Sequence, residues 1–155
     1  MVILAKPING RKIDPFKYPT TVPFPRYTKE EDTVAREFIK EKKWKGEYYF
    51  DVHLTSRKAK FVENLPAPLA RLWTEVTAKR IDMLVVTRDR IRIVEVKRYM
   101  LSSGIGQLLT YRKMFKEEYR PNVPIELWYA VWYYDPDVIE MCKQLGINYW
   151  SYIKE

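Results

Sequence analysis

The segment 81–97 constrains the fold most, because it holds two apolar, β-branched runs that only the dipeptide Arg88-Asp89 separates. A gap of two residues between two strands is long enough only for a hairpin turn. The turn fixes the register of the hairpin, and this register places Asp82 directly across from Glu95. Directly opposed residues have Cβ atoms about 4.5–5.5 Å apart, a separation at which two carboxylates can hold one cation.

The surroundings of this acidic pair are predicted to be apolar. Apolar residues occupy both faces of the hairpin: Leu84 and Ile93 next to the pair, and Ile81, Met83, Val94 and Val96 on the opposite face. Two carboxylates in such a setting repel each other and lose hydration, so they share a proton or bind a cation. Mg²⁺ suits the site because it prefers oxygen ligands, and the backbone carbonyl of Val96 is a candidate further ligand. Lys97 projects from the same face as Glu95, so a purely structural pair that Lys97 and Arg80 neutralise is the alternative.

The rest of the chain alternates helix and strand patterns. Five of its ten prolines fall within the first 25 residues, which predicts an extended Pro-rich arm over 1–27 and a single domain over 28–155. Thr28 and Glu31 have the spacing of a capping box at the start of a helix that Gly46 is expected to stop. The fold class is α/β, with a central mixed β-sheet flanked by helices in the order αβαββαβαβ. The expected elements are helix 28–44, strand 47–54, helix 65–76, strands 81–87 and 90–97, helix 105–118, strand 125–134, helix 137–144 and strand 147–153.

Two residue counts exclude whole classes of chemistry. The chain has one cysteine, Cys142, and one histidine, His53. An intramolecular disulfide framework, a Cys-based zinc cluster, a His-rich metal site and a Cys-His pair that uses any second histidine are therefore excluded. No apolar run approaches the ~20 residues of a transmembrane helix, and the apolar stretch at the start of the chain is too short for a signal peptide. We therefore expect a soluble, cytoplasmic protein, or one in the host cell if it is viral.

The charge of the chain favours an anionic partner. With 28 Lys and Arg against 20 Asp and Glu, the formal net charge is +8. Nucleic acid is the first partner to consider, ahead of an anionic membrane surface, because polyanions bind with release of counterions. A solvated basic surface, of the kind found in proteins from thermophiles, is the alternative. The candidate phosphate-binding residues are Lys58, Lys60, Lys79, Arg80, Arg98, Arg112, Lys113 and Lys116.

The spacing of these motifs resembles that of a known family. Arg80-Ile81-Asp82, then Glu95-Val96-Lys97, then Gln107-x-x-x-Tyr111 is similar to the motif set of the PD-(D/E)XK nuclease superfamily. The QxxxY element resembles that of the RecB-like and archaeal repair-nuclease branches. Ile81 stands where the motif has proline, and branches with a Gly-Arg-Ile-Asp-like version share this departure. The resemblance implies a restriction-endonuclease-like core.

The resemblance also implies roles for these residues. Asp82 and Glu95 would ligate Mg²⁺ or Mn²⁺, and Lys97 would orient or deprotonate the attacking water and stabilise the phosphate. Gln107 and Tyr111, one helical turn apart, would lie beside the active site. An acidic residue on the first helix often completes such a site; the candidates in order are Glu31, which is equally well explained as a capping residue, and Asp32, with Asp51 and Glu75 as spare acids.

The function implied by the resemblance is metal-dependent hydrolysis of phosphodiester bonds in DNA, or in RNA. Superfamily members often dimerise to cut two strands, so a homodimer is one expected assembly. The runner-up is a nuclease-fold protein that binds nucleic acid without cutting it, or that serves as an assembly component. A protein partner is the third alternative, and a Lys- and Glu-rich compact chain would suit a viral or archaeal origin.

Overall fold

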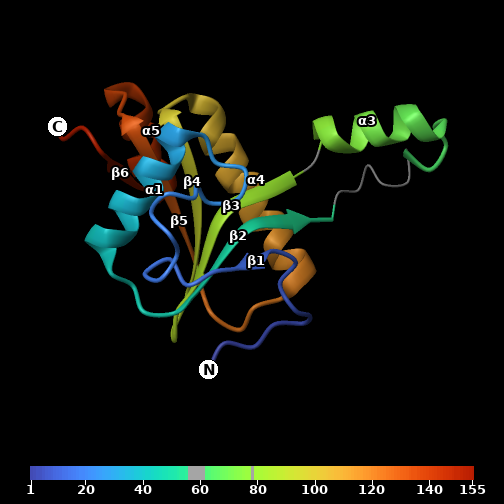
Figure 1. The fold of residues 1–155 in the computed structure, drawn as a ribbon, viewed down its shortest axis with the longest axis horizontal. Coiled ribbons are helices and arrows are strands. Elements are labelled where there is room, and N and C mark those ends of the chain that lie inside the picture. The colour runs from blue at the N-terminus through green and yellow to red at the C-terminus, as the bar shows by residue number, and fades with distance from the viewer. Residues whose placement is uncertain (56–61, 78) are drawn as a thin grey trace.

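The computed structural model describes residues 1–55, 62–77 and 79–155, without the side chains of 74–77. Helices and strands alternate along most of the chain (Figure 1). In chain order the elements are β1 (Arg11–Lys12), α1 (Lys29–Lys42), β2 (Glu47–Leu54), α3 (Ala67–Thr77), β3 (Lys79–Val86), β4 (Ile91–Tyr99), α4 (Ser102–Tyr119), β5 (Ile125–Tyr133), α5 (Pro136–Leu145) and β6 (Asn148–Ser151).

The strands form one mixed sheet of six, in the order β1-β2-β3-β4-β5-β6. Strands β1 to β4 pair antiparallel, whereas β4 with β5 and β5 with β6 pair parallel. The α/β class and the mixed sheet are thus confirmed. The expected order of helices and strands is also present, with one addition, because the proline-rich arm contributes β1 to the edge of the sheet.

Helices cover the sheet on both faces (Figure 1). On one face α1 packs through Val34, Ala35 and Phe38 in a cluster that includes residues of β2 to β5. On the other face α4 and α5 pack in a second cluster, which contains Leu108 and Phe115 of α4 and Val138 and Cys142 of α5. This three-layer arrangement buries the central strands on both sides, as their apolar sequences require.

The start of α1 follows the sequence pattern, but its end does not. Thr28 accepts a hydrogen bond from the Glu31 amide and Glu31 accepts one from the Thr28 amide, which confirms the capping box. The helix ends at Lys42, because Lys43 adopts a left-handed conformation with φ of 55°. The expected stop at Gly46 is therefore wrong. A side chain at Gly46 would instead collide with the backbone of Val86 at the end of β3, so glycine serves close packing there.

The helix α4 also begins differently from the expectation. It starts at Ser102 rather than near Ile105, and its N-cap is Leu101, whose side chain makes no capping hydrogen bond. Gly104 lies in the first turn, where an added Cβ would overlap the ring of Tyr129 on β5. This glycine lets the helix approach the sheet closely, and the hydroxyl of Tyr129 donates to the carbonyl of Leu101 at 2.7 Å.

The register of the β3–β4 hairpin is confirmed down to the pair Met83–Val94. Beyond that pair, the regular alternation of side chains between the two faces of the sheet breaks in β2 and in β3. Asp51 of β2 has φ of 54°, in the left-handed region that non-glycine residues rarely adopt in a strand. Val52 and Leu54, which follow Asp51 on β2, pack in the cluster against α4, and so does Ile81, the β3 partner of Val52. The expectation that Ile81 shares a face with Met83 is therefore wrong, because Ile81 packs in the cluster against α4 and Met83 in the cluster with α1.

The helix α3 lies apart from the three layers, at the ends of β2 and β3 (Figure 1). Its apolar residues Leu69, Leu72 and Trp73 have the helical spacing that the sequence shows, yet they are exposed. Among the helices in the described ranges, none has the length and apolar character needed to cross a membrane.

Candidate functional site

A polar cavity of about 220 Å³ lies where β3 and β4 separate. It brings together residues from the N-terminal arm, the start of α1, three neighbouring strands and α4. Its lining includes Asp82, Glu95, Lys97, Gln107 and Tyr111, the five residues expected to carry the chemistry. The lining residues that complete it are Pro25, Arg26, Tyr27, Glu31, Asp51 and Arg80.

Asp82 lies one residue beyond the last backbone pair of the hairpin. Its Oδ2 accepts a hydrogen bond from the amide of Val96 at 2.9 Å. In a continued β-ladder, a backbone carbonyl of β3 would accept such a bond, and here the Asp82 side chain takes its place. The carboxylate is thereby held against the Glu95 position of β4. Val96, the predicted backbone ligand, contributes its amide to this contact.

Glu95 is the most deeply buried charged residue of the site, with only 2% of its side chain exposed. Its Oε1 lies 3.5 Å from the ammonium of Lys97, whose side chain is 37% exposed. Its Oε2 is buried and has no hydrogen-bond partner among the described residues. An unpartnered carboxylate oxygen in a buried position is costly, and it marks a place where a cation or a donor would be stabilised.

The electrostatics of the pair follow from its burial. Loss of hydration raises the pKa of Glu95 well above its usual range, and the negative charge of Asp82 raises it further. Burial also raises the pKa of Asp82, although the hydrogen bond from the Val96 amide and the charge of Lys97 oppose the rise. Burial alone would lower the pKa of Lys97, but the charges of the two carboxylates outweigh it and raise this pKa. The two carboxyl groups therefore favour a shared proton or a cation, and the lysine stays an ammonium.

Gln107 and Tyr111 of α4 face the same cavity, as their spacing predicts. Burial raises the pKa of Tyr111, and the charges of Glu95 and Asp82 add to the rise. The phenol therefore keeps its proton and acts as a hydrogen-bond donor. Tyr27, at the end of the arm, donates to the backbone carbonyl of Asp82 at 2.9 Å.

The candidate further acids differ in whether they line the cavity. Glu31 lines the cavity, although its Oε1 also accepts the capping hydrogen bond from Thr28. Asp32 does not line it: this carboxylate accepts from the amide of Phe24 and pairs with Arg36 at 2.7 Å, which makes it a link between the arm and α1. The side chain of Glu75 lies outside the described residues.

Asp51 lines the cavity from the neighbouring strand. Its carboxylate pairs with Arg80 at 3.3 Å, lies 3.9 Å from Arg26, and contacts His53 at 3.4 Å. The left-handed φ at Asp51 turns this residue out of the regular ladder. A rare backbone conformation at a polar cavity is a recurrent feature of functional sites.

The basic residues named from the sequence lie in different surroundings. Arg80 lines the cavity, where Asp51 holds it. Arg98 is exposed and lies over the ring of Tyr99, and Lys113 pairs with Glu117 on α4. The cavity lining does not include Lys79, Arg112 or Lys116. Lys58 and Lys60 lie outside the described residues.

The arm residues of the cavity were missed by the sequence reasoning. Arg26 and Tyr27 directly precede the N-cap Thr28, so proximity to the expected acid Glu31 was the one local signal for them. The approach of Tyr27 to Asp82 is a tertiary contact over more than fifty residues of chain. No local pattern encodes such a contact.

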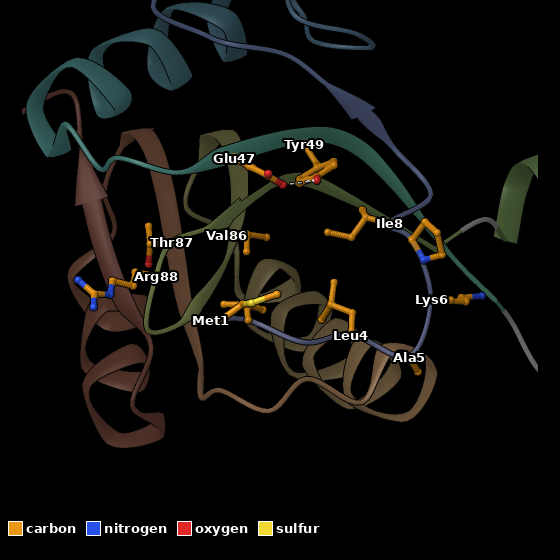
Figure 2. A pocket seen from close by; sticks show the side chains of 12 residues that line it. Met1, Leu4, Ala5, Lys6, Ile8, Glu47, Tyr49, Val86, Thr87 and Arg88 are labelled. Atoms are coloured by element: carbon orange, nitrogen blue, oxygen red, sulfur yellow. Dashed lines mark hydrogen bonds between the residues drawn. The ribbon is translucent and has the colours of Figure 1, made fainter.

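A larger cavity of about 860 Å³ lies elsewhere, between the first residues of the arm and the Val86 end of β3. Figure 2 shows that Leu4 and Ile8 point into it from the arm, opposite Tyr49 and Val86. Its lining is largely apolar and includes neither carboxylate of the acidic pair. The candidate catalytic residues therefore line the smaller cavity, and the larger cavity lies between the N-terminal arm and the sheet.

Within the described ranges, no group of three or more Asp, Glu, His or Cys side chains is arranged to hold a metal ion. The acidic pair supplies two carboxylates, and Glu31 and Asp51 line the same cavity. No family model, no curated protein and no solved structure matches this chain. The superfamily resemblance of the motifs consequently stays a prediction, and the cavity itself has to support any functional assignment.

Proposed function

We propose that this protein is a metal-dependent nuclease that hydrolyses phosphodiester bonds in DNA. One observation carries the proposal: a buried pair of carboxylates, Asp82 and Glu95, shares a polar cavity with the ammonium of Lys97. Metal-dependent phosphodiester hydrolysis uses negative side chains to hold the cation and positive charge to bind the phosphate, and these residues provide both in one place.

The donor set fits a hard divalent cation. The partnerless Oε2 of Glu95 and the carboxylate of Asp82 are oxygen ligands, and a site with two carboxylates suits Mg²⁺ or Mn²⁺, which keeps several waters. Glu31 is the further acid that the cavity offers, with the carbonyl of Val96 as a backbone ligand. When bound, such an ion lowers the pKa of a water ligand and offsets charge on the phosphate.

The residues around the pair support the same chemistry. Because the carboxylates raise the pKa of Lys97, its ammonium donates hydrogen bonds and does not take a proton from water. We therefore assign Lys97 to orienting the nucleophile and stabilising the phosphate, rather than to deprotonation. Tyr111 keeps its phenolic proton and donates from α4, beside Gln107. Arg80, held by Asp51, offers a guanidinium to a phosphate oxygen.

DNA is the proposed substrate because the formal net charge of +8 favours polyanions. The expected homodimer, which would place two cavities on two strands, is part of the same proposal. One observation favours a second function: Lys97 already neutralises part of the charge on Glu95, and the described residues supply two clustered carboxylates rather than three. On that basis a nucleic-acid-binding or assembly role without cleavage is the alternative.

A cleavage assay on labelled single-stranded, duplex and branched DNA tests the proposal, with Mg²⁺, Mn²⁺ or EDTA. Glu95→Gln and Asp82→Asn preserve the shapes of the side chains and remove their charges. Glu126→Gln is the matched control, because Glu126 is a carboxylate of the next strand that pairs with Arg90 and Arg92 outside the cavity.

We expect metal-dependent cutting in the native protein and the control, and none in the two site variants. Cutting that persists in both site variants would refute the assignment. DNA binding without cutting in every metal condition would select the non-catalytic alternative.

A further inference from the structure

Two tyrosines form an exposed aromatic pair at the C-terminal ends of β4 and β5. Tyr99 and Tyr133 are partners in the parallel register. Their rings are stacked, with centroids 5.5 Å apart and planes 20° apart. They are 51% and 42% exposed, and neither belongs to a core cluster. This pair therefore presents aromatic surface to the solvent, with the ring of Tyr133 also 6.1 Å from that of Trp132.

The pair lies next to the candidate site on the same face of the sheet. Glu95, Lys97 and Tyr99 alternate along β4, so their side chains leave the strand on one face. One alternation step spans about 6.6–6.8 Å, which places Tyr99 one step beyond Lys97. On β5, Val131 packs in the cluster against α4, and Tyr133 follows it by two residues on that same face.

The charge around the pair suits an anionic strand. The guanidinium of the exposed Arg98 lies 5.1 Å from the centroid of the Tyr99 ring. A guanidinium binds phosphate oxygens and also stacks on planar rings, so it can serve the backbone of a strand whose base contacts the tyrosines. A base in a duplex has both faces covered by its neighbours, whereas an unpaired base has a free π-face for an aromatic side chain.

We propose that Tyr99 and Tyr133 form a stacking platform for an unpaired nucleobase of single-stranded nucleic acid that approaches the cavity. The platform would select substrates with unpaired nucleotides beside the scissile phosphate, such as single strands and flaps. It deepens the proposed nuclease function and rests on it for the link to cleavage. The binding itself requires neither the metal nor the acidic pair.

The test measures binding in EDTA by fluorescence anisotropy, with labelled oligo-dT, oligo-rU and a DNA duplex of equal length. The variants are Tyr99→Ala, Tyr133→Ala and the double substitution. The matched control is Tyr152→Ala, which removes a tyrosine of similar exposure that packs on Trp132. The double Tyr→Phe variant keeps both rings, and thermal melting of every variant checks that it is folded.

We expect the double alanine variant to bind a single strand about 5- to 150-fold more weakly, the range that loss of one base stack produces. Binding to the duplex and binding by the Tyr152→Ala and Tyr→Phe variants should remain within about twofold of the native protein. Weaker binding of oligo-dT or of oligo-rU by the double alanine variant supports the platform. The oligonucleotide whose affinity falls more shows whether the platform binds DNA or RNA.

Unchanged single-strand binding by a folded double alanine variant would overturn the proposal. An equal loss on the duplex would overturn it as well, because the platform would then not distinguish unpaired bases. Cleavage by the Glu95→Gln variant is a separate measurement. If Glu95→Gln still cuts, the nuclease site is wrong whatever the binding data show, and the two failures are therefore distinguishable.

Discussion

Removing the charge of Glu95 should stabilise the metal-free protein at pH values above the ordinary pKa of a glutamate. The folded chain raises the pKa of this group from its ordinary value of 4.5, chiefly because it buries the carboxyl group and places Asp82 beside it. Above pH 4.5 the native state therefore holds a proton that the unfolded state has released. The free energy of unfolding falls as the pH rises through this window, because deprotonation is harder in the native state.

The magnitude follows from the same linkage. Each unit of elevation of the pKa corresponds to about 1.36 kcal/mol of stability lost by the time the pH has passed the folded value. For a domain of this size, that is about 3–5 °C in the melting temperature. Glu95→Gln removes the penalty, and its amide can donate to the carboxylate of Asp82. The variant should therefore melt above the native protein, by a margin that grows as the pH rises above about 4.5.

Glu126→Gln is a control that should change the melting temperature in the opposite direction. Burial opposes the ionisation of Glu126, but hydrogen bonds from Trp128, Arg90 and Arg92 lower its pKa overall. Its charge therefore contributes stability that is present above the unfolded pKa and lost as the pH falls through the folded one. Glu126→Gln should melt below the native protein at neutral pH.

Thermal melts in EDTA across the pH range measure both effects. The reasoning is refuted if Glu95→Gln melts at or below the native protein at about pH 8, or if the difference does not change with pH.

Three further outcomes follow from the structure. Gly104→Ala should destabilise the fold by about 1–3 kcal/mol in chemical unfolding, because its Cβ would overlap the ring of Tyr129, whereas Gly106→Ala, with nothing within 4 Å, should stabilise it by about 0.5–1 kcal/mol. Equal effects of the two would contradict the close approach of α4. Lys97→Met should lower the cleavage rate by about 10²–10³-fold while DNA affinity in EDTA changes little, and a loss seen only in affinity would assign the lysine to binding. Mg²⁺ should raise the melting temperature of the native protein but not that of Asp82→Asn, and an equal rise in both would place the ion elsewhere.

The parts of the fold that sequence predicted are those set by short-range geometry. A two-residue turn fixes the hairpin register, and Thr28 with Glu31 forms the capping box. That register predicts Asp82 beside Glu95 and Lys97; the backbone pairing ends one residue earlier, at Met83–Val94, and the bond from the Val96 amide to Asp82 holds the two strands together beyond it. For this reason the centre of the candidate site was accessible before the structure.

The rest depended on contacts between distant segments. The left-handed φ at Asp51 breaks the alternation of β2, and this strand contains no glycine or proline that would indicate the break. The apolar spacing of α3 predicts a helix correctly but does not say whether the helix has anything to pack against, and Leu72 is exposed. The arm reaches the site through Tyr27, which only the folded chain brings to Asp82.

The position of β4 at the junction of the antiparallel and parallel parts of the sheet has a consequence for folding kinetics. Its pairing with β3 closes a two-residue loop, whereas its pairing with β5 must wait for the whole of α4 to cross over. The hairpin that carries the acidic pair can thus assemble while its carboxylates are still hydrated. The carboxylates then lose their hydration late in folding, when α4 and β5 pack against the hairpin. Substitutions that remove this charge should therefore slow unfolding more than they accelerate folding, which the two arms of a chevron plot would measure directly.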